Sequence, residues 1–412
     1  MTLHEGFGEN VDFQAAMQAA LDSVAYSRTA LPLVKAQNDF ATRLLARLEG
    51  RRIGLLQAPS SVATGATRRQ NLLISPTSLW QTLALTAGGA QGETKRQLKQ
   101  LLATSGLKDE EVGAANRALN AVLTEQVGAM IMVANSVWFH RGFSPEPTFV
   151  ERAQHDFKAT VGQFSEHDLA DGAQRINEWV SAQTQGEIPC IVEAGSLLDL
   201  SALLVNAVYF RARWSIPFGE HQTKPKPFHL ANGRKIEVSM MHGREKVPYL
   251  RELSFEGVKL AYENTSYAMW ALLPNRGKTP TDVLRELGGE SLRQLKERDT
   301  IIAALPRFEI SWGHDLKEEL AAMNAPLPFS RAADFRAMGT PVERISKVLH
   351  VCKMRVDEEG TIATAATAVF ITKSIERERP KTLVFDRPFV VVLVEETSGA
   401  RLFEGTVYDP RG

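Results

Sequence analysis

Cysteine is nearly absent from this sequence, which has only Cys190 and Cys352 among its 412 residues. Two cysteines cannot build a disulfide scaffold, and their separation does not match the spacing of metal ligands. We therefore expect a protein of a reducing compartment with no metal site. An excess of charge is absent too, because 48 basic residues balance 48 acidic residues. A general role in binding nucleic acid or a membrane surface gains no support from this balance.

Long hydrophobic runs are also missing. No stretch approaches the roughly 20 consecutive apolar residues that a membrane-spanning helix needs. The N-terminus has acidic residues early and no continuous apolar run before Gln37, so we expect no signal peptide. These absences indicate a cytoplasmic protein, with secretion by another route left open. Residues 1–30 read as an N-terminal extension whose role the sequence does not assign.

The motifs of common enzymes are absent as well. There is no G-x-S-x-G nucleophile motif, no H-E-x-x-H metal motif and no phosphate-binding loop. Gly88, Gly89 and Gly92 follow a predicted helix rather than a strand, which is the wrong context for nucleotide binding. No two of the nine histidines stand four residues apart, which argues against a helical metal site. Because catalysis needs a convergent set of acid, base or nucleophile, we expect neither an enzyme nor a cofactor.

The sequence does contain a helix-rich front half and a strand-rich back half. Helical spacing marks residues 37–48 and 176–184, and a short strand from Asn71 leads into a helix with Pro76 near its start. Thr94 is expected to cap the next helix. Candidate strands lie over residues 131–139, 203–210, 257–273, 301–310, 348–356, 389–394 and 401–407. Strands and helices do not alternate regularly, so the pattern is that of an α+β fold.

Two further local predictions concern the back half. Asn232-Gly233 is a strong signal for a two-residue hairpin turn. Residues 279–298 are rich in charge and are predicted to form one helix.

The most informative stretch runs from Asp357 to Pro388. An acidic turn ends at Gly360, and a run dominated by Thr and Ala follows. Between Gly360 and Lys373 there is no charged residue. With the two-residue period of a strand, one face of this run carries only small side chains. They are Thr361, Ala363, Ala365 and Thr367. Such a segment can lie exposed as a loop and can also enter a sheet without burying a charge.

Motifs in a fixed order give the chain a resemblance to the serpin family, from about Gln37 to Pro410. Each motif alone is weak, but the whole set in this order is highly specific. The motifs are Asn71-Leu-Leu-Ile-Ser75-Pro76-Thr-Ser78, Gly89-Ala-Gln-Gly92-Glu-Thr94, Ala134-Asn-Ser-Val-Trp-Phe139, Ile176-Asn-Glu-Trp179-Val180, Val205-Asn-Ala-Val-Tyr-Phe210 with Trp214, Met240-Met241, Leu305-Pro-Arg-Phe308, Ala333-Asp-Phe335, Glu358-Glu-Gly360-Thr361, Asp386-Arg-Pro388-Phe389 and Leu402-Phe-Glu-Gly405.

This resemblance implies an α+β serpin fold with three β-sheets, about nine helices and an exposed reactive-centre loop over about residues 358–385. It also implies one domain over residues 31–412 and a monomer without a cofactor. The implied function is suicide-type inhibition of serine proteases, or of cysteine proteases. The target protease would cleave the loop and be trapped as an acyl-enzyme while the loop inserts into the central sheet. The inhibitor would supply no catalytic group, and the protease would lose its oxyanion site.

The resemblance assigns roles to individual residues. A hydrogen-bonded cluster beneath the opening of the central sheet is matched by Ser75, Ser78, Asn206 and His350. Without the family pattern, Ser75 would merely precede a helix, and His350 would be a core histidine with its hydrogen bonds satisfied. Trp214 matches a tryptophan at the top of that sheet, and an ordinary core tryptophan is the alternative. The hinge of the loop is matched by Glu358, Glu359, Gly360, Thr361, Ala363, Ala365 and Thr367.

The attacked bond has two candidates in this sequence. Family spacing counted from the hinge glycine places it after Ser374 and before Ile375, which suits an elastase- or subtilisin-like protease with a small pocket. Chemistry favours Lys373 for a trypsin-like pocket that carries a buried carboxylate. One departure from the family is Ile362, where many inhibitory members have Glu.

The alternative function is that of a non-inhibitory serpin-like chaperone or carrier whose loop never inserts. The small, uncharged hinge residues favour inhibition over this alternative. The basic residues Lys95, Arg96 and Lys99 share one predicted helix and could suggest a polyanion site. An ordinary solvated face is the favoured reading of that helix.

Overall fold

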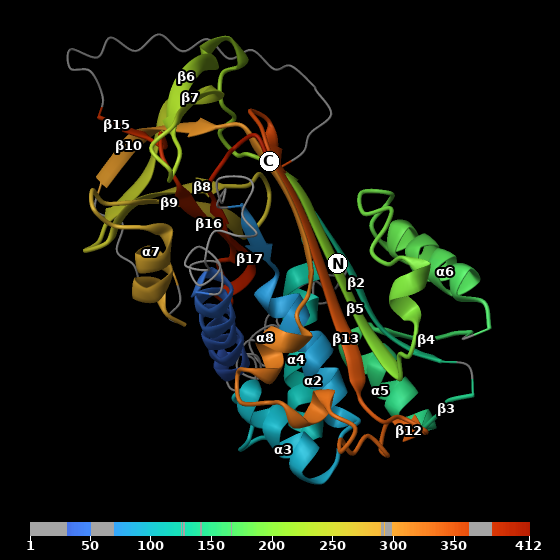
Figure 1. The fold of residues 1–412 in the computed structure, drawn as a ribbon. Coiled ribbons are helices and arrows are strands. Elements are labelled where there is room, and N and C mark those ends of the chain that lie inside the picture. Colours follow the sequence, from blue (N-terminus) through green and yellow to red (C-terminus); the bar gives the residue numbers. More distant parts are fainter. Residues whose placement is uncertain are drawn as a thin grey trace, which may run out of the picture.

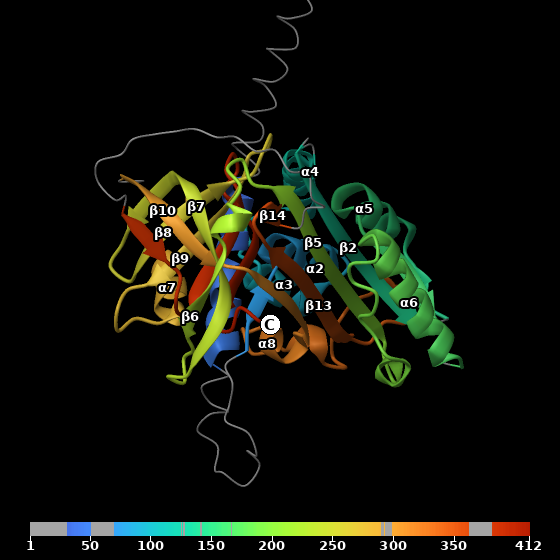
Figure 2. The same cartoon turned by 90° about the horizontal axis from the view of Figure 1, so that it is seen from above.

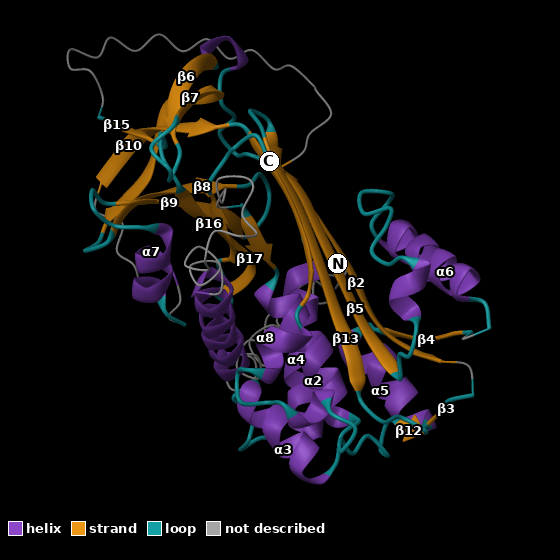
Figure 3. Cartoon of the chain, in the orientation of Figure 1, coloured by secondary structure: helices purple, strands orange, loops and turns teal. Residues whose placement is uncertain are grey.

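The computed structural model describes most of the chain. The described residues are 31–50, 70–124, 126, 128–140, 142–165, 167–289, 292, 299–361 and 381–412. Within them, strands form three sheets, of nine, six and two strands. Helices gather mainly on one side of the long strands of the six-stranded sheet (Figure 1, Figure 3). The α+β fold with three sheets that the sequence predicts is thereby confirmed.

The six-stranded sheet has the strand order β11-β13-β5-β2-β4, with β14 paired to β5. Its strands are β2 (Ala129–His140), β4 (Thr160–Phe164), β5 (Ala202–Arg213), β11 (Phe308–Asp315), β13 (Ile345–Val356) and β14 (Gly360–Thr361). The central strands β5 and β13 are parallel, and each has an antiparallel partner on its other side, β2 and β11 respectively.

The central pair separates at one end of this sheet. β5 pairs with β13 from Ala202 as far as Tyr209, and its last two residues, Ala212 and Arg213, pair with β14 instead. Figure 2 shows β14 beside that end of β5. The sheet is therefore closed along most of β5 and open at the end where β14 lies.

The two faces of the six-stranded sheet have different coverings. Side chains alternate along a strand, so Val208 and Phe210 of β5 lie in the main hydrophobic core, while Val205 and Ala207 lie in a smaller one. The main core includes α2 (Pro76–Gly88), and the smaller core includes α6 (Leu169–Gln183). Figure 1 shows these two helices on opposite sides of β5.

The central helix of the main core is α2. Ser75 has an extended backbone, and Pro76 fits the first helical position because the N–H that proline lacks would have no helical partner there. Every residue from Pro76 to Ala87 is buried, as expected for a helix enclosed on all sides rather than an amphipathic one. This burial fixes Ser75 and Ser78 beneath the six-stranded sheet.

The other elements surround this arrangement. The remaining helices are one over residues 31–50, α3 (Gly92–Leu101), α4 (Asp109–Thr124), α5 (Pro147–Phe157), α7 (Pro280–Leu287), α8 (Lys317–Ala321) and the short 3₁₀ turns η1 (Ala194–Leu197), η2 (Glu220–Gln222) and η4 (Leu327–Phe329). The nine-stranded sheet contains β1 (Leu72–Ile74), β6 (Lys224–His229), β7 (Lys235–Arg251), β8 (Phe255–Ala261), β9 (Tyr267–Pro274), β10 (Asp299–Pro306), β15 (Thr382–Val384), β16 (Phe389–Glu395) and β17 (Ala400–Val407). The two-stranded sheet pairs β3 (Ser144–Pro145) with β12 (Gly339–Thr340).

Three local predictions were wrong in detail. α3 begins at Gly92, so Thr94 is not its cap; its hydroxyl instead accepts the backbone N–H of Asp334 at 2.9 Å. The loop that joins β6 to β7 comprises residues 230–234 rather than two residues. It is held by backbone hydrogen bonds from the Leu230 N–H to the Arg234 carbonyl and from the Gly233 N–H to the Leu230 carbonyl. α7 ends at Leu287, where the following glycine has a positive φ that a continuing helix does not allow.

Candidate functional site

Two apolar strands each carry one buried asparagine near the middle. They are Asn135 of β2 and Asn206 of β5, which lie opposite each other in the strand register. His350 of β13 lies opposite Asn206 on its other side. These three side chains are at most 3% exposed. Buried polar groups need hydrogen-bond partners, and α2 supplies several of them.

Asn135 is the central acceptor of the resulting cluster. Its Oδ1 accepts hydrogen bonds from Ser78 Oγ at 3.1 Å, from Thr82 Oγ1 at 3.1 Å and from Asn206 Nδ2. The Asn206 amide also donates to Ser78 Oγ at 2.5 Å. These bonds join β2 and β5 to α2. We call this set, with Ser75 and His350, the polar cluster.

His350 extends the polar cluster to the third strand, β13. Its Nε2 accepts the backbone N–H of Ser75 at 3.0 Å, so the ring proton of neutral His350 lies on Nδ1 and is donated to Asn206 Oδ1 at 2.5 Å. Burial lowers the pKa of His350 from 6.5 to about 3, although the contact with Asn206 opposes this shift. The ring is therefore neutral at neutral pH. Cys352 Sγ lies 3.3 Å from Nε2, and burial raises the pKa of this thiol.

At the open end of the sheet, β14 already occupies a place beside β5. Gly360 lies opposite Arg213, and Thr361 lies opposite Ala212. A Cβ atom at Gly360 would collide with the carbonyl oxygen of Ala212, so only glycine allows this close approach. Thr361 is 0% exposed, and its hydroxyl oxygen lies 2.7 Å from that of Tyr262. Gly360, the last residue of the acidic turn, and Thr361, the residue after it, are thus part of the sheet.

Trp214 follows β5 and holds the segment that precedes β14. Its backbone N–H donates to the carbonyl of Glu359 at 2.9 Å, and its indole Nε1 donates to the carbonyl of Asp357 at 3.0 Å. The indole stacks on the Tyr262 ring with centroids 4.4 Å apart and an interplanar angle of 19°. Through Tyr262, the same stack supports the Thr361 side chain.

Glu358 anchors the acidic turn from the inside. Its side chain is 4% exposed, and its Oε2 lies 2.6 Å from Arg307 Nε. The Thr223 hydroxyl donates to Oε1. Burial raises the pKa of Glu358, but hydrogen bonds from Arg307 and Thr223 outweigh burial and leave the pKa below its ordinary value. Burial instead raises the pKa of the neighbouring Asp357. Glu358 is therefore an ionised carboxylate that is buried and paired.

The residues that the sequence singled out fall into two groups. The polar cluster brings together Ser75, Ser78, Asn206 and His350. The open end of the sheet brings together Trp214, Glu358, Glu359, Gly360 and Thr361. Counted along β5 from Asn206 to Ala212, the two groups are about 20 Å apart. The other predicted positions lie outside the described residues: Ala363, Ala365, Thr367, Lys373, Ser374 and Ile375.

Five further residues complete these groups and were not singled out from the sequence: Thr82, Asn135, Thr223, Tyr262 and Arg307. For Asn135 a signal was present, because an asparagine inside an apolar strand needs a buried partner. Asn206 gives the same signal in the strand that pairs with it. The other four depend on contacts between distant segments, which local sequence does not report.

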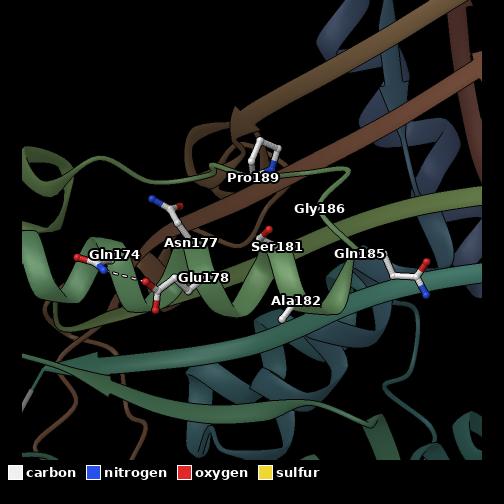
Figure 4. Close-up of a pocket in the computed structure, with 8 residues that line it drawn as sticks. All are labelled: Gln174, Asn177, Glu178, Ser181, Ala182, Gln185, Gly186 and Pro189. Atoms are coloured by element: carbon white, nitrogen blue, oxygen red, sulfur yellow. Dashed lines mark hydrogen bonds between the residues drawn. The ribbon is translucent and has the colours of Figure 1, made fainter.

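A depression on α6 has a different character. It is lined by Gln174, Asn177, Glu178, Ser181, Ala182, Gln185, Gly186 and Pro189, and Figure 4 shows these residues along the helix and on the segment that returns beside it. Gln174 donates to Glu178 at 2.8 Å, and Asn177 holds the returning segment through the backbone of Ile191 and Val192. Glu178 is the only carboxylate in this lining, so no acid–base pair is assembled here.

The basic residues of α3 have acidic partners. Lys95 and Lys99 lie 2.6 Å and 3.0 Å from the Asp109 carboxylate, and Arg96 pairs with Glu93. This engagement supports an ordinary helix surface rather than a polyanion site.

Other site classes find no support in the part of the chain that the structure describes. There, no group of three or more His, Cys, Asp or Glu side chains could hold a metal ion. Among the described helices, none has the length and apolar character needed to cross a membrane.

Comparison with known proteins gives a consistent result. A family model described as serpin (serine protease inhibitor) matches residues 36–410. Serpin-ZXA of Oryza sativa subsp. japonica is 31% identical over 394 residues, which cover 91% of this chain and 96% of that protein. Leukocyte elastase inhibitor of Bos taurus is 31% identical over 356 residues, which cover 82% of this chain and 93% of that protein.

Solved structures show the same fold. The native state of tengpin, a thermophilic serpin, superposes with a TM-score of 0.79 at 26% identity, covering 91% of this chain and 94% of tengpin. Human thyroxine-binding globulin superposes with a TM-score of 0.78 at 21% identity, covering 93% of this chain and 100% of that chain. At 21% identity, the similarity to thyroxine-binding globulin concerns the fold alone.

Proposed function

The chain belongs to the serpin family, and we propose that it is a suicide-type inhibitor of serine proteases that traps its target by inserting a cleaved loop into the six-stranded sheet. Serpins are generally protease inhibitors rather than enzymes, and one similar protein is an elastase inhibitor by name. For this chain, the proposed steps are cleavage of the loop by the protease, insertion of the cleaved loop into the sheet, and formation of a covalent complex with the protease.

The observation that carries this proposal is the position of β14. Gly360 and Thr361 pair antiparallel with β5 at the end of the sheet where β5 and β13 have separated. The pairing fixes a direction and a register for any residues that follow. Each further residue of the chain would lie opposite the preceding residue of β5, between β5 and β13.

This register explains the small side chains that follow Gly360. Thr361 lies opposite Ala212, so Ala363 and Ala365 would come opposite Phe210 and Val208, which face the main core. The face that carries only small residues would then enter the crowded side of the sheet. On the same count, Thr367 would come opposite Asn206, between it and His350.

Insertion would improve the pairing of the sheet. A strand running antiparallel to β5 would also run antiparallel to β13, because β5 and β13 are parallel. One parallel pairing would be replaced by two antiparallel ones, and the backbone groups of the loop would gain partners. Cleavage of the loop removes the tether that opposes this gain, so the intact fold would be metastable.

The chemistry belongs to the protease in this scheme. Its serine attacks the loop carbonyl, the peptide C–N bond breaks, and the leaving amine departs as a new N-terminus while the ester remains. Insertion then carries the ester-linked protease away and disturbs its oxyanion site, so water cannot complete hydrolysis. The chain contributes the loop peptide bond that fits the protease active site, and the free energy released when the loop inserts.

The test is a covalent complex that survives SDS. Incubation with trypsin, pancreatic elastase or subtilisin should give a band that joins this chain to the protease. Cleavage without such a band, with the protease still active, would overturn the proposal and favour a non-inhibitory carrier or chaperone.

The attacked bond is resolved by mass spectrometry of the released fragment. A new N-terminus at Ile375 identifies Ser374 as the attacked residue, and one at Ser374 identifies Lys373. In the second case, Lys373→Ala should weaken inhibition of trypsin by about 10- to 1000-fold, because the buried carboxylate of the protease pocket loses its partner. In the first case, the same variant should leave inhibition of elastase or subtilisin nearly unchanged.

A further inference from the structure

The paired part of β5 and β13 ends at Tyr209 and Lys353, which lie opposite each other. Beyond this last pair, the end of β5 pairs with β14 instead. Side chains alternate along a strand, and two residues earlier Ala207 belongs to the smaller core beside α6 while Val351 packs against it. Tyr209 and Lys353 therefore point to the face of the sheet that α6 covers.

The segment that follows α6 places a carboxylate over this last pair. Glu187 Oε2 lies 3.1 Å from Lys353 Nζ. Burial and, after it, the nearby charge of Glu187 raise the pKa of Tyr209, which reflects the closeness of the same carboxylate to β5. Glu187 thus lies over both strands at the point where they separate.

The turn that carries Glu187 is held by hydrogen bonds of the helix end. The backbone N–H of Gly186 donates to the Ser181 carbonyl at 2.8 Å, and that of Glu187 donates to the Thr184 carbonyl at 3.0 Å. The next residue, Ile188, is 3% exposed and belongs to the smaller core. The carboxylate is therefore positioned by an ordered helix end on one side and a buried anchor on the other.

α6 and the turn after it belong to the half of the sheet that contains β5. The smaller core joins α6 to Trp138 of β2, Phe164 of β4 and Val205 of β5. From β13, only the partly buried Leu349 and Val351 pack against this core. An ion pair from the turn to β13 therefore crosses the line along which β5 and β13 must part.

We propose that Glu187 and Lys353 form a latch that holds β13 against β5 in the intact protein and slows the entry of the loop. The second half of this statement rests on the function proposed above. Neighbouring strands lie about 4.8 Å apart, so a strand placed between β5 and β13 would double their separation. Counted from β14, the loop residue that would pass Tyr209 is Thr364. Its passage would draw Lys353 away from Glu187.

The same lysine has a second acidic partner, which provides a matched control. Glu309 of β11 lies 3.7 Å from Lys353 Nζ. β11 pairs with β13 from Phe308 to Asp315, so this contact stays within one half of the sheet when the sheet opens. Removing the charge of Glu309 should therefore leave the opening of the sheet unchanged, whereas removing that of Glu187 should favour it.

The test measures hydrogen exchange of the intact protein by mass spectrometry, without any protease target. In Glu187→Gln, the amides of residues 347–353 should exchange about two- to fivefold faster than in the parent. The side chains of the pair are 24% and 32% exposed, so water screens it, and such a pair contributes up to about that factor. Lys353→Gln should give the same acceleration, and the double variant should add nothing further. Glu309→Gln should exchange as the parent does.

A general loosening of α6 is distinguished by its own amides. Residues 176–184 should keep their parent exchange rates in Glu187→Gln, because the backbone hydrogen bonds of the helix end do not involve the carboxylate. Parent rates over 347–353, equal acceleration by Glu309→Gln, additive effects in the double variant, or acceleration spread over α6 would each overturn the latch.

The link to loop insertion is tested separately. Glu187→Gln should form the SDS-stable protease complex with fewer inhibitor molecules cleaved per protease trapped, since the loop enters faster. A missing complex in the parent would count against the proposed function and would leave the exchange result intact. A complex that forms with the parent efficiency, despite faster exchange, would overturn the role of the latch in insertion.

Discussion

Protonation of His350 destabilises the folded protein, because the charged ring would be buried. Its pKa is about 3 in the folded protein and 6.5 when the chain is unfolded, so the unfolded chain binds the proton more readily. Its contribution to stability is complete above pH 6.5 and is lost as the pH falls from 6.5 towards 3. Between pH 7 and pH 5 the free energy of unfolding should fall by about 2 kcal/mol from this group alone.

The measurement compares the denaturation midpoint of the parent with that of His350→Gln at both pH values. The variant should be less stable at pH 7, because the Ser75 N–H and Asn206 lose their partner, and it should lose less stability on acidification. An equal loss of stability in both proteins would show that His350 does not carry this dependence.

Among the secondary elements, the acidic turn before β14 is anchored in part by the ion pair of Glu358 with Arg307. Glu358→Lys would place a cation beside Arg307 in a site where the native carboxylate is 4% exposed. We expect a loss of about 3 kcal/mol in the free energy of unfolding. The double variant Glu358→Lys with Arg307→Glu restores opposite charges and should regain a substantial part of this loss. If the double variant is no more stable than the single one, the pair does not hold the turn.

β14 also gives a matched test of loop insertion. By the register of β14, Thr361 faces the main core, and the next residue, Ile362, would face the opposite side. Thr361→Glu must bury a charge at a cost of several kcal/mol, so the variant should be cleaved as a substrate without trapping the protease. Ile362→Glu adds the same charge one position later and should still trap it. Equal trapping by both variants would refute the facing of the two side chains.

At the scale of the whole molecule, cleavage should stabilise the fold. A cut between Ala368 and Arg377 would free the loop to enter between β5 and β13, where its backbone groups gain partners. The cleaved protein should melt well above the intact one in a thermal scan. An unchanged melting temperature after a clean cut would point to a chain whose loop does not insert.

The success of the sequence predictions depended on how local each feature is. The α+β fold, the course of β5 and the start of α2 follow from residues adjacent in the chain. Thr94 was misassigned because its hydroxyl bonds a backbone group 240 residues away. The contacts of Tyr262 with Thr361, and of Arg307 with Glu358, were invisible for the same reason. Local patterns report propensity, and these contacts are set by the packing of distant strands.

The two cysteines allow the opening of the sheet to be timed chemically. Cys190 is exposed, whereas Cys352 is buried on β13 beside His350 and opposite Val208 of β5. An alkylating reagent should modify Cys190 at once and Cys352 only when the strands separate, since burial also raises the pKa of the Cys352 thiol. The rate of the second modification, read by mass spectrometry, then gives the opening rate. Equal modification rates for the two thiols would contradict a closed sheet.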